Sequence, residues 1–467
     1  MLRKGGLTVF GENRTLHLWK KVRKLRLSTT QIIALTFAGI ILLGTVLLSL
    51  PLSSRNAESC GVLPALFTAT SATCVTGLTL FDTWSQWSGF GQAVILLLIE
   101  VGGLGFMSAA SLVIFLFHRK VGLKQRMVMA QAMSLNDMHG VVRLQKVVLF
   151  GSLGIQLLGA LALMLRFLPE YGFRQSAIWG VFHAVSAFCN AGFDIFGSVA
   201  PGQSLIPLNN DPVVLITLMA LITVGGLGFF VWEELARVRS FKKFSVYTKL
   251  VLIATAVIIT VGTGIILLLE WNNPETLGKM PVGQKILNAC FQTVTLRTAG
   301  FAAIDQGALS DSTKAASMVI MLIGGSSGST AGGMKTVTFV VLVLFIWAKA
   351  RDKSSVHLFH RTIPNNKATD AMTIFFVMVT LAFLGGLFIS ATEQINFTDG
   401  LFEAISALAT VGLTAGITPT LGIPAQILII AFMYFGRVGV LTISLGFLMG
   451  NKAEDRFRYA DANLLIG

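Results

Sequence analysis

The sequence predicts an all-α polytopic membrane protein of four membrane-pore-membrane repeats, with eight transmembrane helices and four re-entrant half-helices around a central pore. The first observation behind this is composition. Of 467 residues, 54% are hydrophobic and only 12% are charged, and the mean hydropathy is +0.75, which is typical of membrane proteins. The second is a series of long apolar runs, and the third is a short glycine-containing stretch that recurs four times between them.

Each recurring stretch ends in a glycine that is followed by a large apolar residue. The glycines are Gly77, Gly192, Gly300 and Gly412, at intervals of 115, 108 and 112 residues. Each follows a short apolar segment and precedes a long one. A period of this kind indicates one structural unit that is repeated four times, with the repeats meeting around an axis.

Repeat 1 (residues 30–118) sets the order of elements. Residues 30–50 are long enough to cross the hydrocarbon of a bilayer, and Pro51 ends the run. As a helix, residues 63–73 would cover only about half of that thickness, so they are expected to dip into the membrane and return. The glycine stretch 74–79 follows, and residues 90–117 form a second span. The order is therefore span, half-helix, glycine turn, span.

The same order predicts repeat 2 (140–240), repeat 3 (246–350) and repeat 4 (368–450). In repeat 2 the elements are 146–167, 176–188, 189–194 and 212–236. In repeat 3 they are 248–271, 283–295, 297–301 and 315–348. In repeat 4 they are 370–391, 399–409, 410–416 and 424–449. A basic N-terminus (1–29) and a short C-terminus (451–467) flank the repeats.

The net charge of +14 is unevenly placed. Eight Lys and Arg residues lie between Arg3 and Arg26, and further clusters occupy 119–146, 237–249, 349–367 and 452–458. These clusters sit at alternate ends of the apolar runs, so both termini are expected in the cytoplasm, and the half-helices are expected to enter from outside. This placement suits contact with anionic membrane lipids rather than with nucleic acid. The first apolar run is too long for a signal peptide and is expected to be retained.

The four cysteines, Cys60, Cys74, Cys189 and Cys290, show no paired spacing. A disulfide framework or a thiolate metal site is therefore not expected, and these residues are interpreted as small packing residues.

The glycine turns carry the chemistry that the repeats predict. Irregular backbone at membrane depth must face protein or water, so four such turns should meet around an aqueous pore. Their carbonyl oxygens could then replace the water of an alkali cation, and the negative ends of the half-helices would favour that cation. Asp194 is a fixed charge near the mouth. The expected filter residues are Val75, Thr76, Gly77, Asn190, Ala191, Gly192, Thr298, Ala299, Gly300, Thr410, Val411 and Gly412. Of these, Thr76, Asn190, Thr298 and Thr410 are expected to add side-chain oxygens or to brace the turns.

The second span of repeat 3 is unlike the others. Its residues 324–333 are mostly Gly, Ser, Thr and Ala, which form helices weakly, so a break is expected beneath the filter. The Gly-Gly-Leu-Gly stretches at 102–105 and 225–228, and Gly436-Arg-Val-Gly439, are interpreted as close helix packing rather than nucleotide sites. Arg437 lies in an apolar span, where a charge is costly unless it is paired or hydrated.

Other intramembrane charges have two interpretations each. Arg297, beside the filter, is expected to be braced by a carboxylate. Lys335 is expected either to pair with Glu233 or Glu234, or to mark the cytoplasmic boundary. Glu100 is either a functional carboxylate or a helix-to-helix bond.

The chain resembles the KtrB-like membrane subunits of the Ktr/Trk/HKT superfamily of potassium uptake systems. The likeness rests on Ala-Thr-Ser-Ala-Thr-Cys-Val-Thr-Gly-Leu (69–78), Ser-Ala-Phe-Cys-Asn-Ala-Gly-Phe (186–193), Thr-Leu-Arg-Thr-Ala-Gly-Phe (295–301) and Thr-Val-Gly-Leu-Thr (410–414). It runs from the first span to the Arg458-Tyr459 pair. It implies a homodimer with one pore per protomer, a bacterial cytoplasmic (inner) membrane location, and a cytoplasmic nucleotide-binding regulatory ring (KtrA-like). Because this chain has no dinucleotide fingerprint, nucleotide is expected only on that partner.

The resemblance also assigns roles to residues. It implies potassium at the four filter glycines, and Gly77, where Ser goes with sodium preference in the superfamily, favours potassium. It allows sodium as a second ion that influences uptake. It implies a gate made of Gly324, Gly325, Ser326, Ser327, Gly328, Ser329, Thr330, Ala331, Gly332 and Gly333 together with Arg437. The basic loops 119–146 and 237–249 are either docking surfaces for the ring or ordinary solvated loops.

Two other classes of function fit the sequence less well than potassium uptake. A secondary transporter of an organic solute coupled to a cation would share broken helices, but inverted repeats would enter from alternating sides. An intramembrane enzyme is not expected, because the histidines mostly lie in loops and no His-Glu-x-x-His motif occurs. His183 alone falls in a half-helix, and it is interpreted as a packing residue.

Overall fold

The structure is a computed structural model that describes residues 29–105, 141–353, 355–359 and 361–439. Several predictions fall outside these residues: the basic N-terminus up to residue 28, most of the loop 119–146, the distal parts of the spans 90–117 and 424–449, and the C-terminus 451–467.

The first half of the chain forms repeats 1 and 2. Repeat 1 contains α2 (Thr29–Ser49), α3 (Val62–Cys74), α4 (Thr83–Gln86) and α5 (Gly89–Leu104). Repeat 2 contains α8 (Val141–Phe188), α9 (Pro212–Leu227) and α10 (Phe229–Arg237). A kink at Gly172, whose φ is 71°, divides α8 into two helices. These two parts are the predicted first span and half-helix of repeat 2, and glycine permits the left-handed backbone between them.

The second half forms repeats 3 and 4. Repeat 3 contains α11 (Val246–Glu270), α12 (Val282–Thr295), α13 (Asp311–Leu322) and α14 (Thr336–Lys349). A small antiparallel hairpin, β1 (Val356–Leu358) and β2 (Arg361–Ile363), precedes repeat 4, which contains α15 (Asn365–Glu393), α16 (Phe397–Leu408) and α17 (Ile423–Val438). Single-turn 3-10 helices are η1 (Pro51–Ser53), η2 (Phe196–Ser198), η3 (Ile206–Leu208), η4 (Phe241–Lys243) and η5 (Thr418–Thr420).

The first helix of every repeat is built to cross a membrane. Among the described residues, four helices are long and apolar enough, namely α2, α8 with its kink at Gly172, α11 and α15. Large apolar side chains on them face outward, such as Leu42 at 62% exposed and Leu268 at 83%. Such exposed apolar surface fits lipid. The chain is thus a helical polytopic membrane protein, as predicted, and the hairpin is a small addition that the sequence did not predict.

The second helices are shorter, and two of them break. The predicted break in repeat 3 is confirmed, because α13 ends at Leu322 and α14 begins at Thr336. The predicted continuous span 212–236 is wrong, because α9 and α10 meet at 95°. The bend is at Gly228, whose φ is 96°; a Cβ there would lie 2.9 Å from the Ser327 carbonyl oxygen. Because Gly228 has no Cβ, the chain can bend here while its backbone lies close to the loop 324–333.

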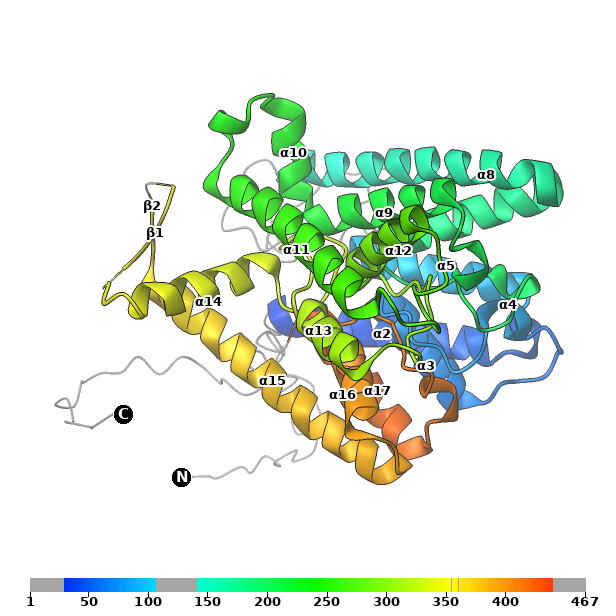
Figure 1. Ribbon diagram of the computed structural model, residues 1–467. Helices are drawn as coiled ribbons and strands as arrows, with labels where there is room; N and C mark the ends of the chain where they lie inside the picture. The colour runs from blue at the N-terminus through cyan, green and yellow to red at the C-terminus, as the bar shows by residue number, and fades with distance from the viewer. Residues whose placement is uncertain (1–28, 106–140, 354, 360, 440–467) are drawn as a thin grey trace, which may run out of the picture.

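The repeats are joined in a closed cycle. Each half-helix packs against the first helix of its own repeat, as α3 does on α2, α12 on α11 and α16 on α15. The second helix of each repeat packs against the segment that carries the next half-helix: α5 on α8, α9 on α12, α13 on α16, and α17 back on α3. Figure 1 shows α3, α12, α13 and α16 gathered near the centre of the molecule, with α8 and α15 at its edges. The cycle brings the four glycine turns to one place.

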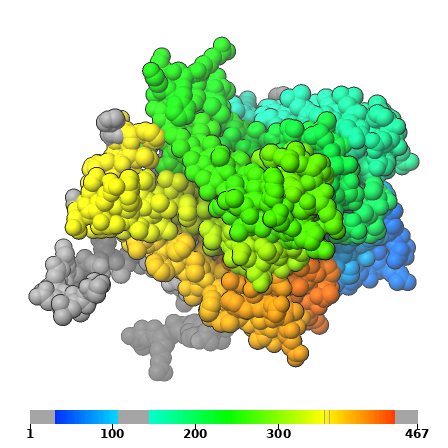
Figure 2. Space-filling model, viewed as in Figure 1, coloured from blue at the N-terminus to red at the C-terminus, as the bar shows by residue number. Residues whose placement is uncertain are grey.

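Two segments project from this body. Figure 2 shows α10 with the turn that follows it standing out from the packed helices, and the hairpin region at another edge of the molecule. α10 ends the broken second helix of repeat 2, and the hairpin follows that of repeat 3, on the side opposite the loops that precede the half-helices. We call the side of those loops the outer side.

Candidate ion pathway

The four glycine turns share one backbone conformation. The glycines have φ values of 102°, 70°, 81° and 92°. The residue two positions earlier is also left-handed in every repeat: Val75, Asn190, Thr298 and Thr410, with φ between 52° and 66°. A left-handed conformation costs a residue other than glycine about 1–3 kcal/mol and persists only where the surroundings enforce it. The four turns are thus alike in geometry as well as in sequence.

The turns close into a ring. Each glycine faces the carbonyl oxygen of the residue before the next glycine, so that an added Cβ would strike that oxygen. The distances from such a Cβ are 2.6 Å for Gly77 to Ala191, 2.8 Å for Gly192 to Ala299 and 2.8 Å for Gly300 to Val411, and for Gly412 the Cβ would overlap the Thr76 oxygen. The spacing that predicted four turns around one axis is therefore matched by direct contact between neighbours, from repeat 1 to 2, 3, 4 and back to 1.

Side-chain hydroxyls within the half-helices brace the turns. Ser71 Oγ accepts a hydrogen bond from Gly77 N, and Ser406 Oγ accepts one from Gly412 N, both at 3.1 Å. Ser186 Oγ instead donates to Phe193 O at 2.7 Å. We did not predict these serines, although a Ser-Ala pair six residues before the glycine recurs in three repeats. In repeat 3 the bracing residue is Thr295, five residues before its glycine, and its hydroxyl donates to Phe301 O at 2.7 Å.

Several oxygens at the ring have no protein partner. Within the described part of the chain, the hydroxyls of Thr76, Thr298 and Thr410 are buried without a hydrogen bond. Asn190 differs, because its amide donates to Arg297 O and accepts from Thr330, both at 3.4 Å. Buried hydroxyls without partners are costly, and they suit a site whose missing partner is a cation. The half-helices also end immediately before the turns, which aims their negative ends at the ring.

A cavity of about 160 Å³ lies above the ring on the outer side. It is lined by all four ring glycines and by two carboxylates, Asp82 and Asp194. Asp194 lies in the loop between α8 and α9, outside the spanning helices. Burial, and then the charge of Asp82, raise the pKa of Asp194 to about 6. The sequence analysis singled out Asp194 but not Asp82, which is brought here by the short helix α4. The mouth is thus negative, as the entrance of a cation pathway should be.

The loop 324–333 lies directly beneath the ring. Thr330 donates to Phe188 O at 3.0 Å and to Asn190 Oδ1, both in repeat 2. On the other side, a Cβ on Gly332 would overlap the Thr410 hydroxyl. The loop therefore touches the turns of repeats 2 and 4 from below, and its small residues are what allow this close approach.

The loop is also held by the bend between α9 and α10. Ser326 N and Thr330 N donate to the carbonyl oxygens of Gly226 and Gly225, at 3.0 and 3.3 Å. In return Phe229 N, at the start of α10, donates to Gly328 O at 2.8 Å. The bend that breaks the predicted span in repeat 2 is thus an anchor for the broken span of repeat 3.

Arg437 joins three repeats beneath the ring. Its guanidinium donates to Thr330 O in the loop and to Gly102 O and Gly103 O in the last turn of α5, the last at 3.0 Å. The end of a helix carries negative charge, so α5 offsets the arginine without a carboxylate. The glycines of α5 also pack closely, as predicted, because a Cβ on Gly102 would overlap the Thr73 oxygen and one on Gly103 would lie 2.7 Å from Cys189.

The ion pair predicted for Arg297 is wrong, and of the two alternatives for Lys335, the pair with Glu233 or Glu234 is not seen among the described residues. Arg297 has no acidic partner among the described residues; its Nη2 lies 3.4 Å from Thr336 Oγ1. Arg297 follows the C-terminal end of α12, whose dipole favours a positive charge there. Lys335 donates to Ala331 O at 2.8 Å instead of pairing with Glu233 or Glu234. Lys335 follows the loop and is a second basic residue near Arg437.

Two other residues take a packing role. Glu100 accepts hydrogen bonds through Oε2 from Gln156 at 2.9 Å and from Cys189 at 3.4 Å, so it links α5 to α8, and its Oε1 is buried without a hydrogen-bond partner among the described residues. The buried His183 donates through Nδ1 to Trp179 O and accepts at Nε2 from Ile195 N. Both of its ring nitrogens are satisfied, as expected of a packing histidine.

Comparison with known proteins gives consistent matches over the length of the chain. Residues 15–456 match the family TrkH, described as cation transport protein. The chain is 40% identical to the potassium/sodium uptake protein NtpJ of Enterococcus hirae over 96% of this chain and 99% of that protein. It is 38% identical to the Ktr system potassium uptake protein B of Bacillus subtilis, over 97% and 100%. In fold it matches the crystal structure of the potassium transporter TrkH from Vibrio parahaemolyticus, with a TM-score of 0.72, 15% identity, and coverage of 91% of this chain and 86% of that one.

Proposed function

Since the chain belongs to the TrkH family of cation transport proteins, we propose that it is the ion-conducting membrane subunit of a potassium uptake system. The names of the Enterococcus and Bacillus relatives, which match over nearly their whole length, support potassium as the transported ion. The observation that carries the proposal is the ring of four glycine turns. The same family likeness argues against a secondary transporter of an organic solute.

Potassium passes through the ring formed by the filter residues that the sequence predicts. Carbonyl oxygens of the turns, with the unpartnered hydroxyls of Thr76, Thr298 and Thr410, replace the water of the ion. Asp82 and Asp194 concentrate cations above the ring, and the half-helix ends stabilise them inside it. Gly77 lets repeat 1 approach the Ala191 carbonyl oxygen of repeat 2, and it favours potassium over sodium as the ion of the ring. Sodium is a second ion that influences uptake, in line with the name of the Enterococcus relative.

The loop 324–333 and Arg437 form the gate. The loop closes the path below the ring, and Arg437, with Lys335 nearby, places positive charge where a cation must leave. Opening requires Arg437 to release the carbonyl oxygens of Thr330 and of α5. The hydrogen bonds between the loop and the α9–α10 bend couple the gate to α10. A cytoplasmic partner that moves α10 would therefore also move Gly328, because Phe229 N donates to Gly328 O.

The subunit composition of the system is inferred from the relatives. The name "Ktr system" of the Bacillus relative supports a multi-component system. We propose a homodimer in the bacterial cytoplasmic membrane, with both termini in the cytoplasm and a nucleotide-binding regulatory ring, KtrA-like, on that face. Among the described residues, the projecting α10 with the turn that follows it and the hairpin between repeats 3 and 4 are candidate surfaces for such a ring. Nucleotide binds only to the partner.

Tracer uptake tests the proposal directly. The chain, expressed with its cytoplasmic partner in potassium-starved cells that lack other importers, should restore growth and ⁸⁶Rb⁺ uptake at low external potassium. Gly300→Asp should abolish uptake while the protein still reaches the membrane, because the side chain would enter the ring. Uptake by Gly300→Asp at the unaltered rate, affinity and selectivity would mean that the ring is not the pathway.

A further inference from the structure

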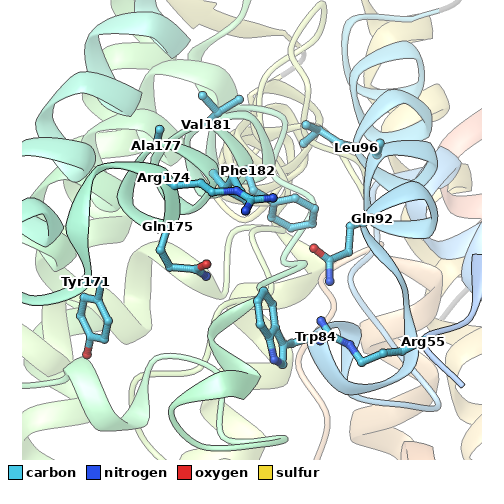
Figure 3. Close-up of a pocket in the computed structure, with 13 residues that line it drawn as sticks. Arg55, Trp84, Gln92, Leu96, Tyr171, Arg174, Gln175, Ala177, Val181 and Phe182 are labelled. Atoms are coloured by element: carbon cyan, nitrogen blue, oxygen red, sulfur yellow. The ribbon is translucent and has the colours of Figure 1, made fainter.

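A second, larger cavity lies away from the ring, on the lipid-facing side of the molecule. It has a volume of about 770 Å³ and lies between repeat 1 and the half-helix part of α8 (Figure 3). None of the ring or loop residues lines it. Its walls are mostly apolar: Ala93, Leu96, Ala177, Ile178, Val181 and Phe182. We call this cavity the α5–α8 groove.

Two arginines enter the groove from opposite walls. Arg174 extends from the start of the half-helix, and Arg55 extends from the loop after α2 and stacks on Trp84 at 4.4 Å (Figure 3). In the described part of the chain neither arginine forms an ion pair. Arg166, in the part of α8 before the Gly172 kink, contrasts with them, because it pairs with Glu170 at 2.7 Å and with Asp211 at 2.5 Å. The groove therefore holds two positive charges that no described carboxylate offsets.

An unpartnered donor adds to these charges. Gln175, which also lines the groove, has its Nε2 buried without a hydrogen-bond partner among the described residues. A buried donor of this kind normally has an acceptor. The first residue of α5, Gly89, lines the groove as well, so the positive end of that helix is directed toward it. An anionic group with several acceptor oxygens would satisfy all of these features.

The surroundings of the groove indicate a lipid rather than a soluble anion. Exposed apolar side chains line it, including Ile178 and Val181 at 44% and 47%. Trp84 and Tyr171 lie at its outer end, and aromatic residues of this kind mark the headgroup level of a bilayer. The apolar walls and the charges lie in one cavity, so its occupant should carry both a hydrocarbon chain and a phosphate.

We propose that the α5–α8 groove binds an anionic phospholipid from the outer leaflet, with its phosphate held by Arg55, Arg174 and Gln175 and an acyl chain along the apolar walls.

Native mass spectrometry of the full chain, reconstituted with equal amounts of phosphatidylglycerol and phosphatidylcholine, tests this proposal. The protein should retain phosphatidylglycerol in at least tenfold preference. Arg55→Gln with Arg174→Gln should reduce that preference by about tenfold. Arg351→Gln is the matched control, because Arg351 also stacks on a tryptophan, Trp347, at 4.1 Å but lies outside the groove. The control should keep the preference.

A second variant tests the apolar part of the site. Ala177→Trp fills the groove and leaves both arginines in place, so it should lower retention of both lipids at this site. An equal loss of preference in Arg351→Gln and in the double variant would overturn the proposal in favour of general surface charge. Unchanged lipid retention in the double variant and in Ala177→Trp, with a shift from dimer to monomer, would overturn it in favour of a contact between two copies of the chain.

Discussion

Comparing Gly412→Ala with Gly416→Ala distinguishes the effect of a steric clash in the ring from the effect of a strained backbone conformation. Gly412 has a φ of 92°, and a Cβ there would overlap the Thr76 carbonyl oxygen and lie 2.9 Å from Gly77 Cα. Gly416, four residues on, has a φ of 95°, but nothing lies within 4 Å of its Cβ position. The two substitutions therefore share a backbone cost of about 1–3 kcal/mol. Only Gly412→Ala also displaces a ring oxygen.

The expected change in apparent KM follows from the overlap between a Cβ at position 412 and the Thr76 carbonyl oxygen. Overpacking a tight site typically costs about 1–3 kcal/mol, and here the ring must move because the obstacle is backbone. If the Thr76 oxygen is a ligand of the ion, about 1.4 kcal/mol of lost binding raises the apparent KM for potassium about tenfold. Gly416→Ala should leave KM within about twofold. The assay is ⁸⁶Rb⁺ uptake with competition by sodium, normalised to membrane-inserted protein. Equal KM and selectivity for the two variants would refute the claim that the ring carbonyls select the ion.

Three further predictions concern the gate and the mouth. Arg437→Gln removes a charge that binds three carbonyl oxygens, and each such bond is worth about 1.5–3 kcal/mol. The variant should leak more potassium in the absence of the partner ring and should unfold at a lower temperature. An unchanged leak would contradict the assignment of Arg437 to the gate. Thr330→Val keeps the shape but loses the bonds to Phe188 O and Asn190, so at about 1 kcal/mol it should raise the leak roughly fivefold, whereas no change would show that the loop is held elsewhere. Because the pKa of Asp194 is raised to about 6, its negative charge is present above that pH and lost below it; apparent potassium affinity should fall as external pH drops from about 7 to 5 and should be flat in Asp194→Asn, and a persistent fall in that variant would assign the effect to another group.

Periodicity predicted most of the fold. The glycine spacing identified four like units, and their order identified the half-helices, because a segment such as 63–73 is too short to cross a membrane. The break in repeat 3 was predictable because glycine and serine weaken a helix over 324–333. These signals are local or repeat regularly, so a single sequence carries them.

The bend at Gly228 was not predicted, although a signal existed. The stretches 102–105, 225–228 and 436–439 all end in a glycine with φ between 81° and 96°. Close helix packing explains their first glycines, but the last glycine has a different function, namely to end the helix. Apolar residues continue past it, so hydropathy alone indicates one span. The bend depends on the loop 324–333, which is distant in sequence.

Partners of the buried charges were the least predictable feature. Arg297 and Arg437 were expected to need carboxylates or water, and the structure instead gives them a hydroxyl and carbonyl oxygens beside helix ends. Every residue has a carbonyl group, so sequence cannot identify which one will accept. The bracing serines could have been identified from the sequence, because Ser71, Ser186 and Ser406 each lie six residues before the glycine of their repeat.

The central claim is that a cation sits on the axis of the ring formed by Gly77, Gly192, Gly300 and Gly412. Anomalous diffraction from crystals of the protein grown in rubidium, and then exchanged into sodium, measures this most directly. The ring geometry predicts a peak between the four turns, surrounded by the carbonyl oxygens of the residues before the glycines, that weakens or moves in sodium. A rubidium peak elsewhere in the membrane region, with none between the turns, would contradict the account.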